Sequence, residues 1–274
     1  MKHEVTELVF LIDRSGSMAG LEDDTIGGFN TMLKQQQAVE GDAYVTVVLF
    51  DDRYELLCDH EDIRQVKPLT ARDYVPQGST ALLDAIERTI HRIKKTQEDT
   101  GVREKVLFFI LTDGQENSSL RCTFPMIRSQ IEHQKEKYGW EFLFFGANMD
   151  AIAEAAKFGI GADRAQNYRA DSVGTTSVYR TMSAVSTAFR TGHGFPCDDS
   201  HGLDRSQSDE PKTPQEAVAK LRNAVGGLQQ AIHGLRHEFE ELHGVAAANH
   251  GKIPDVNEIL REVMGYEPGE EESK

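Results

Sequence analysis

The sequence predicts an α/β fold in which a doubly wound, mostly parallel sheet is flanked by helices and followed by a helical C-terminal appendage. Through the first two-thirds of the 274 residues, short apolar runs alternate with longer amphipathic stretches, as in repeated strand–helix units. Runs such as "VLFFIL" at 106–111 are apolar without interruption, which is typical of parallel strands covered on both faces. Beyond residue 192 the composition changes abruptly.

The first part of the sheet is expected to contain a hairpin. The run "LVFLI" at 8–12 predicts a buried strand, and apolar residues at helical spacing predict a helix over 22–38. The β-branched run 44–50 predicts a second strand. Only three residues separate it from 54–58, so these two strands should pair antiparallel, with 54–58 at the sheet edge. We expect 58–62, "CDHED", to be a charged loop that discourages aggregation at that edge.

The following units repeat the alternation of helix and strand. Leu and Ile along one side of 79–95 predict a helix, with Ser79 or Thr80 as its N-cap. The run 105–114 predicts a central strand. The remaining expected elements are a helix over 123–137, a strand over 140–148, a short helix over 150–160 that stops near Gly159, a last strand within 165–170 and a helix over 172–190.

Composition divides the chain into four parts. Residues 1–192 form the α/β domain. Residues 193–214 are rich in Gly, Pro, Ser and Asp, which predicts a flexible linker. Residues 215–266 are expected to be helical and similar to a coiled coil, and 267–274 form an acidic tail.

The expected C-terminal helix carries an apolar seam whose steps alternate between three and four residues, as in a coiled coil. The seam consists of Val218, Leu221, Val225, Leu228, Ile232, Leu235, Phe239 and Leu242. Gly226, Gly227 and Gly234 each cost about 1 kcal/mol relative to Ala, so the helix must dock on something. Three docking partners for this helix stay open: the same segment, 215–245, of a second copy of the chain, a helix of another protein, or the chain's own first domain.

Charge and cysteine content limit the partners and the compartment. A formal net charge of −15 argues against nucleic acid and against an anionic membrane. Cys58, Cys122 and Cys197 are few, odd in number and widely spaced, so they predict no disulfide framework. The start has no long apolar run typical of a signal peptide, and no run is long enough to span a bilayer. We therefore expect a cytoplasmic protein.

Oxygen-bearing side chains gather where expected strands end. Asp13, Ser15 and Ser17 follow the first strand, Thr80 precedes the helix at 81, and Asp113 follows the central strand. Ligands of such sheets bind at the carboxyl ends of strands. Two carboxylates and three hydroxyls suit Mg²⁺, with Mn²⁺ or Ca²⁺ as other oxygen-preferring choices. No His or Cys lies in these loops, which argues against zinc.

The motifs "DRSGSM", "GST" and "TDG", in this order, resemble the von Willebrand factor type A domain of the intracellular type. The resemblance covers about residues 1–192 and implies a Rossmann-like fold with a complete metal-ion-dependent adhesion site (MIDAS). It implies that Asp13, Ser15 and Ser17 hold the metal directly or through water. It implies that Thr80 and Asp113 exchange direct and water-mediated roles.

The resemblance also implies a function, namely that a protein partner supplies a Glu or Asp to the metal. The protein would then be a binding module and not an enzyme. Family members of this kind often work beside AAA+ ATPases, kinases or phosphatases.

Other interpretations of the same residues stay open. Ser15 and Ser17 could cap the next helix. The protein could be a scaffold assembled through its C-terminal helix, with an ion that only stabilises the fold. It could also be a metal-dependent phosphohydrolase with Asp13 as nucleophile. The sequence pattern of such enzymes, however, requires a second Asp two residues after the first, at the position that Ser15 occupies here. Glu116 and Asn117 are either part of the metal-site rim or ordinary loop residues.

A zinc site in the expected linker is a further alternative. The segment "HGFPCDDSH" places His193, Cys197 and His201 close together, with Asp198 and Asp199 between them. The spacing matches no zinc finger, so solvated linker is the preferred interpretation.

Overall fold

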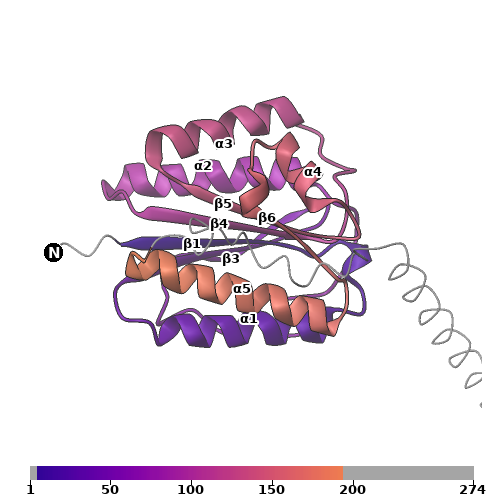
Figure 1. The fold of residues 1–274 in the computed structure, drawn as a ribbon, viewed down its shortest axis with the longest axis horizontal. Helices are drawn as coiled ribbons and strands as arrows, with labels where there is room; N and C mark the ends of the chain where they lie inside the picture. Colours follow the sequence, from indigo (N-terminus) through magenta and orange to yellow (C-terminus); the bar gives the residue numbers. More distant parts are fainter. Residues whose placement is uncertain (1–4, 194–274) are drawn as a thin grey trace, which may run out of the picture. The chain divides into compact units, whose positions relative to one another are not determined.

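The computed structural model describes residues 5–193 as a six-stranded sheet between two layers of helices (Figure 1). The strands are β1 (Thr6–Asp13), β2 (Ala43–Phe50), β3 (Tyr54–Asp62), β4 (Lys105–Thr112), β5 (Glu141–Ala147) and β6 (Ala165–Tyr168). The helices are α1 (Glu22–Gln37), α2 (Leu82–Thr100), α3 (Phe124–Tyr138), α4 (Ala151–Lys157) and α5 (Ser172–Thr191), with short 3₁₀ turns at Gly16–Met18 and Ala162–Arg164.

The sheet has the order β3-β2-β1-β4-β5-β6, which confirms the doubly wound prediction. All neighbouring strands are parallel except β2 and β3, which form the expected antiparallel hairpin at an edge. From β1 the chain builds outward to β3 and then returns to add β4 on the other side of β1. The carboxyl ends of β1 and β4 therefore form a topological switch point, where such sheets bind ligands.

Each sheet face is covered by its own set of helices. Helices α1 and α5 lie on one face, and α2, α3 and α4 lie on the other (Figure 1). Every residue of β1 is buried, because side chains alternate between two covered faces. Phe10 meets Phe29 of α1 edge-on at 5.6 Å between ring centroids and stacks on Phe109 of β4 at 5.2 Å. Burial on both faces explains why the central strand sequences are apolar without alternation.

Helix α2 begins later than predicted, and the expected N-cap is wrong. The helix starts at Leu82, and its N-cap residue is Ala81, which makes no side-chain capping bond. The first-turn N–H groups of Leu83 and Asp84 instead donate to the Glu116 carboxylate at 2.9 Å and to Ser119 Oγ at 3.1 Å. Long-range capping leaves Thr80 outside the helix and available for another role.

The charged segment 58–62 is part of β3, so the prediction of a loop there is wrong. Pairing with β2 continues to Asp62 through two register irregularities. His60 adopts φ 47° at this irregular stretch, and its ring stacks on Tyr44 of β2 at 4.0 Å. Its backbone N–H donates to Thr46 Oγ1 at 3.0 Å. Local cross-strand contacts of this kind extend a strand beyond its apolar run.

His60 lies between two buried carboxylates. Its Nδ1 is 3.4 Å from Glu7 Oε2, and its Nε2 is 3.7 Å from Glu104 Oε1. Both Glu side chains are essentially inaccessible to solvent. The contact with Glu7 raises the pKa of His60 and outweighs the opposing effect of burial. When it is protonated, the His60 ring offsets part of the charge of these two buried carboxylates.

Replacing His60 by Gln is expected to destabilise the fold by about 1–3 kcal/mol at pH 6. Because the folded-state pKa is raised, the histidine's contribution is present below its ordinary pKa and is lost as pH rises through the folded value. Urea unfolding at pH 6 and pH 9 should show a smaller difference between wild type and variant at pH 9. The exposed His91→Gln is the matched control, and an equal loss for His60→Gln at both pH values would contradict the assignment.

Within residues 5–193, no helix combines the length and the apolarity needed to cross a bilayer. The predicted linker, C-terminal helix and acidic tail lie outside the described residues, as do Cys197 and His201 of the alternative zinc site. Those interpretations stay predictions.

Candidate metal centre

Asp13, the last residue of β1, is fully buried and is held by three hydrogen bonds. Its Oδ1 accepts a hydrogen bond from the Ser15 backbone N–H at 2.6 Å, and its Oδ2 accepts one from Thr112 Oγ1 at 2.6 Å. Its backbone carbonyl accepts a bond from the Tyr74 hydroxyl at 2.7 Å. The carboxylate is therefore fixed at the switch point before anything binds.

The two serines connect this loop to the end of β4. Ser17 Oγ donates to Asp113 Oδ1 at 2.6 Å, and the Ser15 and Ser17 hydroxyl oxygens are 3.1 Å apart. Ser15 and Asp113 are buried, whereas Ser17 is exposed. Asp113 Oδ2 is also buried and has no hydrogen-bond partner among the described residues. Neither serine caps the 3₁₀ turn or α1 through its side chain, so the capping alternative is wrong.

Thr80 completes the group, because its hydroxyl and that of Ser17 both lie close to Gly114. A Cβ built on Gly114 would lie 3.2 Å from Thr80 Oγ1 and 3.3 Å from Ser17 Oγ. Gly78 shapes the backbone just before Thr80, because its φ of +69° is a conformation that favours glycine. The Gly78 carbonyl also accepts a hydrogen bond from the Gly16 N–H at 3.1 Å, which ties this segment to the loop after β1. The structure thus brings all five predicted residues together at one end of the sheet.

The two carboxylates are electrostatically unfavourable where they lie. Burial raises the pKa of Asp13 to about 6, although its bonds to Thr112 and Ser15 partly lower it. Burial also raises the pKa of Asp113. Arg14 does not neutralise them, because its guanidinium pairs with Asp51 at 3.0 Å and with Glu55 at 2.6 Å.

The donor set fits a hard divalent cation. Two carboxylates would balance its charge, and the hydroxyls of Ser15, Ser17 and Thr80 add neutral oxygen ligands. The buried, unpartnered Asp113 Oδ2 and the space that a Cβ on Gly114 would fill are consistent with a small bound ion. Among the described residues, no group of three or more His, Cys, Asp or Glu side chains is arranged to hold a metal, so no competing site of that type is present there.

Several residues that position the site were not singled out from the sequence. Thr112 and Tyr74 hold Asp13. The sequence leaves Glu116 and Asn117 open between the rim of the metal site and an ordinary loop, and the structure gives them a bracing role. Asn117 Oδ1 accepts from Thr80 N–H at 2.9 Å, while Glu116 binds the start of α2. For Glu116 and Asn117 the available signal is a polar side chain in the loop that follows β4, whereas Tyr74 lies far from any strand end and gives no such signal.

Replacing Gly114 by Ala is expected to lower metal affinity by about 10-fold without destabilising the fold. The added methyl group would press on both Thr80 Oγ1 and Ser17 Oγ, and about 1.4 kcal/mol of lost binding free energy corresponds to that factor. Calorimetric titration with Mn²⁺ measures the change, and thermal unfolding in EDTA checks the fold. Gly27→Ala is the control, since a Cβ there meets nothing within 4 Å; unchanged Mn²⁺ affinity in Gly114→Ala would contradict this geometry.

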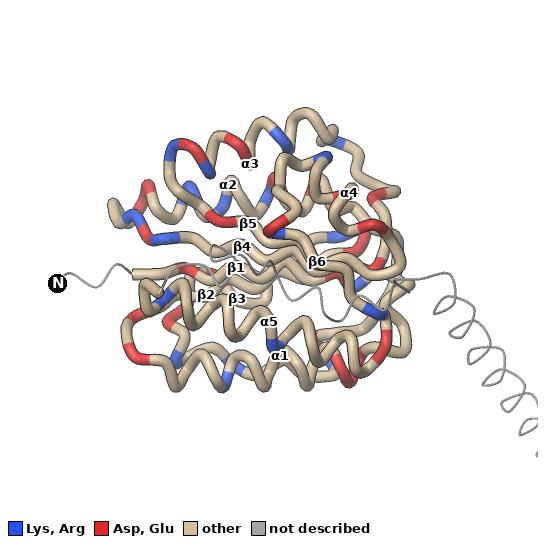
Figure 2. The backbone as a smooth tube through the Cα atoms, viewed as in Figure 1, with Lys and Arg blue, Asp and Glu red and all other residues tan. Residues whose placement is uncertain are grey.

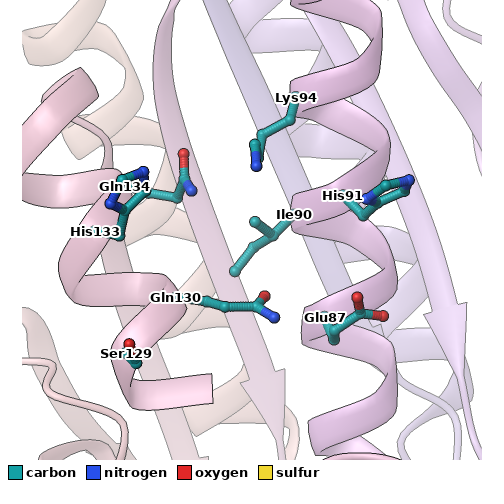
Figure 3. Close-up of a pocket in the computed structure, with 8 residues that line it drawn as sticks. All are labelled: Glu87, Ile90, His91, Lys94, Ser129, Gln130, His133 and Gln134. Atoms are coloured by element: carbon teal, nitrogen blue, oxygen red, sulfur yellow. The ribbon is translucent and has the colours of Figure 1, made fainter. Parts of the chain in front are cut away.

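A separate open groove of about 300 Å³ lies between α2 and α3 (Figure 3). Ile90 lines it, and Lys94 and Gln134 face it from opposite helices. Its lining residues come from the middle parts of the two helices and not from the loops at the strand ends. The groove is therefore distinct from the metal centre.

Residues 8–115 match the family model of the von Willebrand factor type A domain. The match includes all five candidate ligands and ends two residues after Asp113. Together with the observed fold, it supports a von Willebrand factor type A domain in this part of the chain. No curated protein matches the sequence.

Solved structures with a similar fold are distant in sequence. One is a von Willebrand factor type A protein from Catenulispora acidiphila, with 16% identity, a TM-score of 0.45, and 68% of this chain and 43% of that chain covered. Another is proximal thread matrix protein 1 of the mussel byssus with a zinc-occupied MIDAS motif, with 14% identity, a TM-score of 0.49, and 68% and 46% covered.

A third is the D319A mutant of the PilB minor pilin of Streptococcus sanguinis, with 13% identity, a TM-score of 0.48, and 70% and 64% covered. The chain therefore aligns with less than two-thirds of each of these proteins.

Proposed function

We propose that this protein is a divalent-metal-dependent binding module that captures an acidic side chain of a partner protein. Asp13, Ser15, Ser17, Thr80 and Asp113 would hold Mg²⁺ or a similar ion at the carboxyl end of the sheet. A bound dication with one open coordination position would accept an oxygen of the partner's Glu or Asp. The chain's own contribution is a rigid arrangement of ligands on three loops.

The observation that carries the proposal is that side-chain oxygen atoms from the loops after β1 and β4 contact one another at the carboxyl ends of these strands. A chain of short contacts runs from Ser15 Oγ through Ser17 Oγ to Asp113 Oδ1, and Thr80 Oγ1 faces the same space as Ser17 Oγ. These residues are separated by as many as 98 positions in sequence, and only the fold brings them together. A purely structural role would not need two buried carboxylates with raised pKa values at one place.

The residues support binding more than catalysis. Within residues 5–193, the hydrogen bonds of the five candidate ligands involve no His, Lys or Cys. A phosphohydrolase would need a positioned acid or base in addition to the metal ligands. The scaffold alternative differs in one measurable respect, because its assembly would survive chelation of the metal.

A capture experiment tests the proposal. The full chain is immobilised, incubated with cell lysate in Mg²⁺ and eluted with EDTA, with Asp13→Ala in parallel. We expect proteins that elute with EDTA from wild type and are absent from the variant, while circular dichroism shows both forms folded. Identical eluates from the two forms would refute metal-dependent capture, and metal-dependent release of phosphate from a generic ester would favour the enzyme alternative.

A further inference from the structure

Three tyrosine side chains meet in the buried layer between the sheet and the helices α1 and α5 (Figure 1). They are Tyr74, Tyr168 at the end of β6, and Tyr179 of α5. Tyr74 donates its hydroxyl proton to the Asp13 carbonyl. The hydroxyl groups of Tyr168 and Tyr179 are buried and have no hydrogen-bond partner among the described residues. An unpaired buried polar group costs about 1–3 kcal/mol, so these two hydroxyl groups need a partner beyond the side chains around them.

The register of the sheet places Tyr168 in line with a candidate metal ligand. Ala147 of β5 pairs with Tyr168, and the residue before Ala147 pairs with Thr112 of β4. Asp113 follows Thr112, so it lies in the same row as Ala147 and Tyr168. Residues two strands apart are separated by about 10 Å between their Cα atoms. The side chain between them is only a methyl group, so the Tyr168 ring has room to extend over Ala147 toward Asp113.

The Asp113 carboxylate acts electrostatically on the Tyr168 hydroxyl. Burial raises the pKa of Tyr168 well above its ordinary value, and the charge of Asp113 raises it further, followed by the effect of Tyr179. Asp113 Oδ1 accepts a hydrogen bond from Ser17, whereas its buried Oδ2 has no partner within residues 5–193. A buried donor and a buried acceptor, each without a hydrogen bond, therefore belong to side chains that lie close together.

The elements that supply Tyr168 and Tyr179 bring no positive charge to Asp113. Strand β6 contains no charged residue, and the only charged residues of α5 are Arg180 and Arg190 (Figure 2). Arg180 is exposed, and Arg190 donates to backbone carbonyl groups at the C-terminal end of α1. A neutral hydrogen-bond donor can support Asp113 without competing with a cation for its charge.

We propose that one bound water molecule links the Tyr168 hydroxyl to Asp113 Oδ2, and that Tyr168 is thereby a positioning residue of the metal centre. The Tyr179 hydroxyl is the third polar group at this water, which gives the water the two to four partners that buried waters have. A carboxylate oxygen has two lone pairs, so Oδ2 can accept this hydrogen bond and still coordinate an ion. This inference rests on the proposed function, because it adds a support to the same metal centre.

Replacing Tyr168 by Phe tests the proposal in the full chain, because it removes the hydroxyl group and keeps the ring. We expect the variant to bind Mn²⁺ about 10-fold more weakly than the wild type, since partners that orient metal ligands typically affect metal affinity by about 10–100-fold. Calorimetric titration measures the affinity, and circular dichroism shows whether the variant is folded. Tyr138→Phe is the matched control at the last residue of α3, and it should keep the wild-type affinity.

A double-mutant comparison shows whether Tyr168 acts through Asp113. Asp113→Ala removes the oxygen that the water contacts, so adding Tyr168→Phe to this variant should change the Mn²⁺ affinity by less than about 2-fold. A purely structural role of the hydroxyl group would give the same loss in both backgrounds. That result, or wild-type Mn²⁺ affinity in Tyr168→Phe alone, would overturn the water link and leave the metal centre in place. Equal Mn²⁺ affinity in the wild type and in Asp13→Asn would overturn both.

Discussion

Replacing Asp13 by Asn is expected to lower the affinity for Mg²⁺ or Mn²⁺ by at least about 100-fold, a loss of about 3 kcal/mol. The amide removes one of the two charges that would face a bound ion while keeping the shape of the side chain. Its oxygen can still accept the Ser15 N–H, and its NH₂ group can donate to Thr112 Oγ1. The Thr112 hydroxyl can then turn its single proton to the Gly114 carbonyl, which lies 2.9 Å from Thr112 Oγ1. The loop should therefore keep its conformation.

The same substitution is expected to stabilise the metal-free protein at neutral pH. The pKa of Asp13 is raised by burial to about 6 from an ordinary value of 3.8. The folded state therefore binds more protons than the unfolded state between these values, and stability falls as pH rises through this range. Above pH 6 the wild type carries a cost on the order of 1–3 kcal/mol that Asn avoids, whereas below pH 4 the difference disappears.

Two measurements check this prediction. Titration calorimetry with Mn²⁺ gives the affinity, and thermal unfolding in EDTA at pH 4 and pH 7.5 gives the stability difference. Asp52→Asn is the matched control, because Asp52 lies in the β2–β3 turn at the same end of the sheet and its side chain is about half exposed. Equal Mn²⁺ affinity in wild type and Asp13→Asn would show that the ion binds elsewhere.

The prediction of Asp13 as a ligand was available from the sequence because of how parallel strands are arranged. Uninterrupted apolar runs marked β1 and β4, and strands that run in one direction end at one edge. Polar residues directly after those runs had to lie near one another. The structure confirms this for Ser17 and Asp113, which are hydrogen-bonded across 96 positions.

Features that depend on irregular backbone could not be predicted in this way. The continuation of β3 through His60 depends on a stacking contact with Tyr44, on the buried Glu7 of β1 and on the buried Glu104, which precedes β4. None of these contacts produces a periodic pattern of apolar residues in the sequence. The start of α2 differs from the sequence prediction for a similar reason, because the acceptors that cap it come from a loop more than 30 positions away and not from the residues just before the helix.

Glu116 is the clearest case of a residue whose role only the fold reveals. Its carboxylate accepts four hydrogen bonds, three from backbone N–H groups and one from a hydroxyl. The donors are Leu83 N–H at 2.9 Å, Ser118 N–H at 2.9 Å, Ser119 N–H at 2.7 Å and Ser119 Oγ at 2.7 Å. It thus joins the loop after β4 to the first turn of α2, where a negative charge also interacts favourably with the helix dipole.

Replacing Glu116 by Ala is expected to destabilise the fold by about 2–4 kcal/mol, because hydrogen bonds to a charged group are each worth about 1.5–3 kcal/mol and part of this is recovered by water. Metal affinity should fall by about 10-fold as well, since the loop braced by Glu116 also positions Thr80. Urea unfolding in EDTA and Mn²⁺ titration measure the two effects. Glu116→Gln keeps one acceptor oxygen and should fall between wild type and Ala in both.

The neighbouring Gln115→Ala provides the control, because Gln115 is exposed and lies in the same loop. A loss of stability without any change in Mn²⁺ affinity would show that Thr80 keeps its position without this brace. In that case Asn117, which contacts Thr80 directly through both its backbone and its side chain, would be sufficient to position the ligand. A loss of both would place the start of α2, the loop after β4 and Thr80 in one cooperative unit that forms the far side of the metal centre.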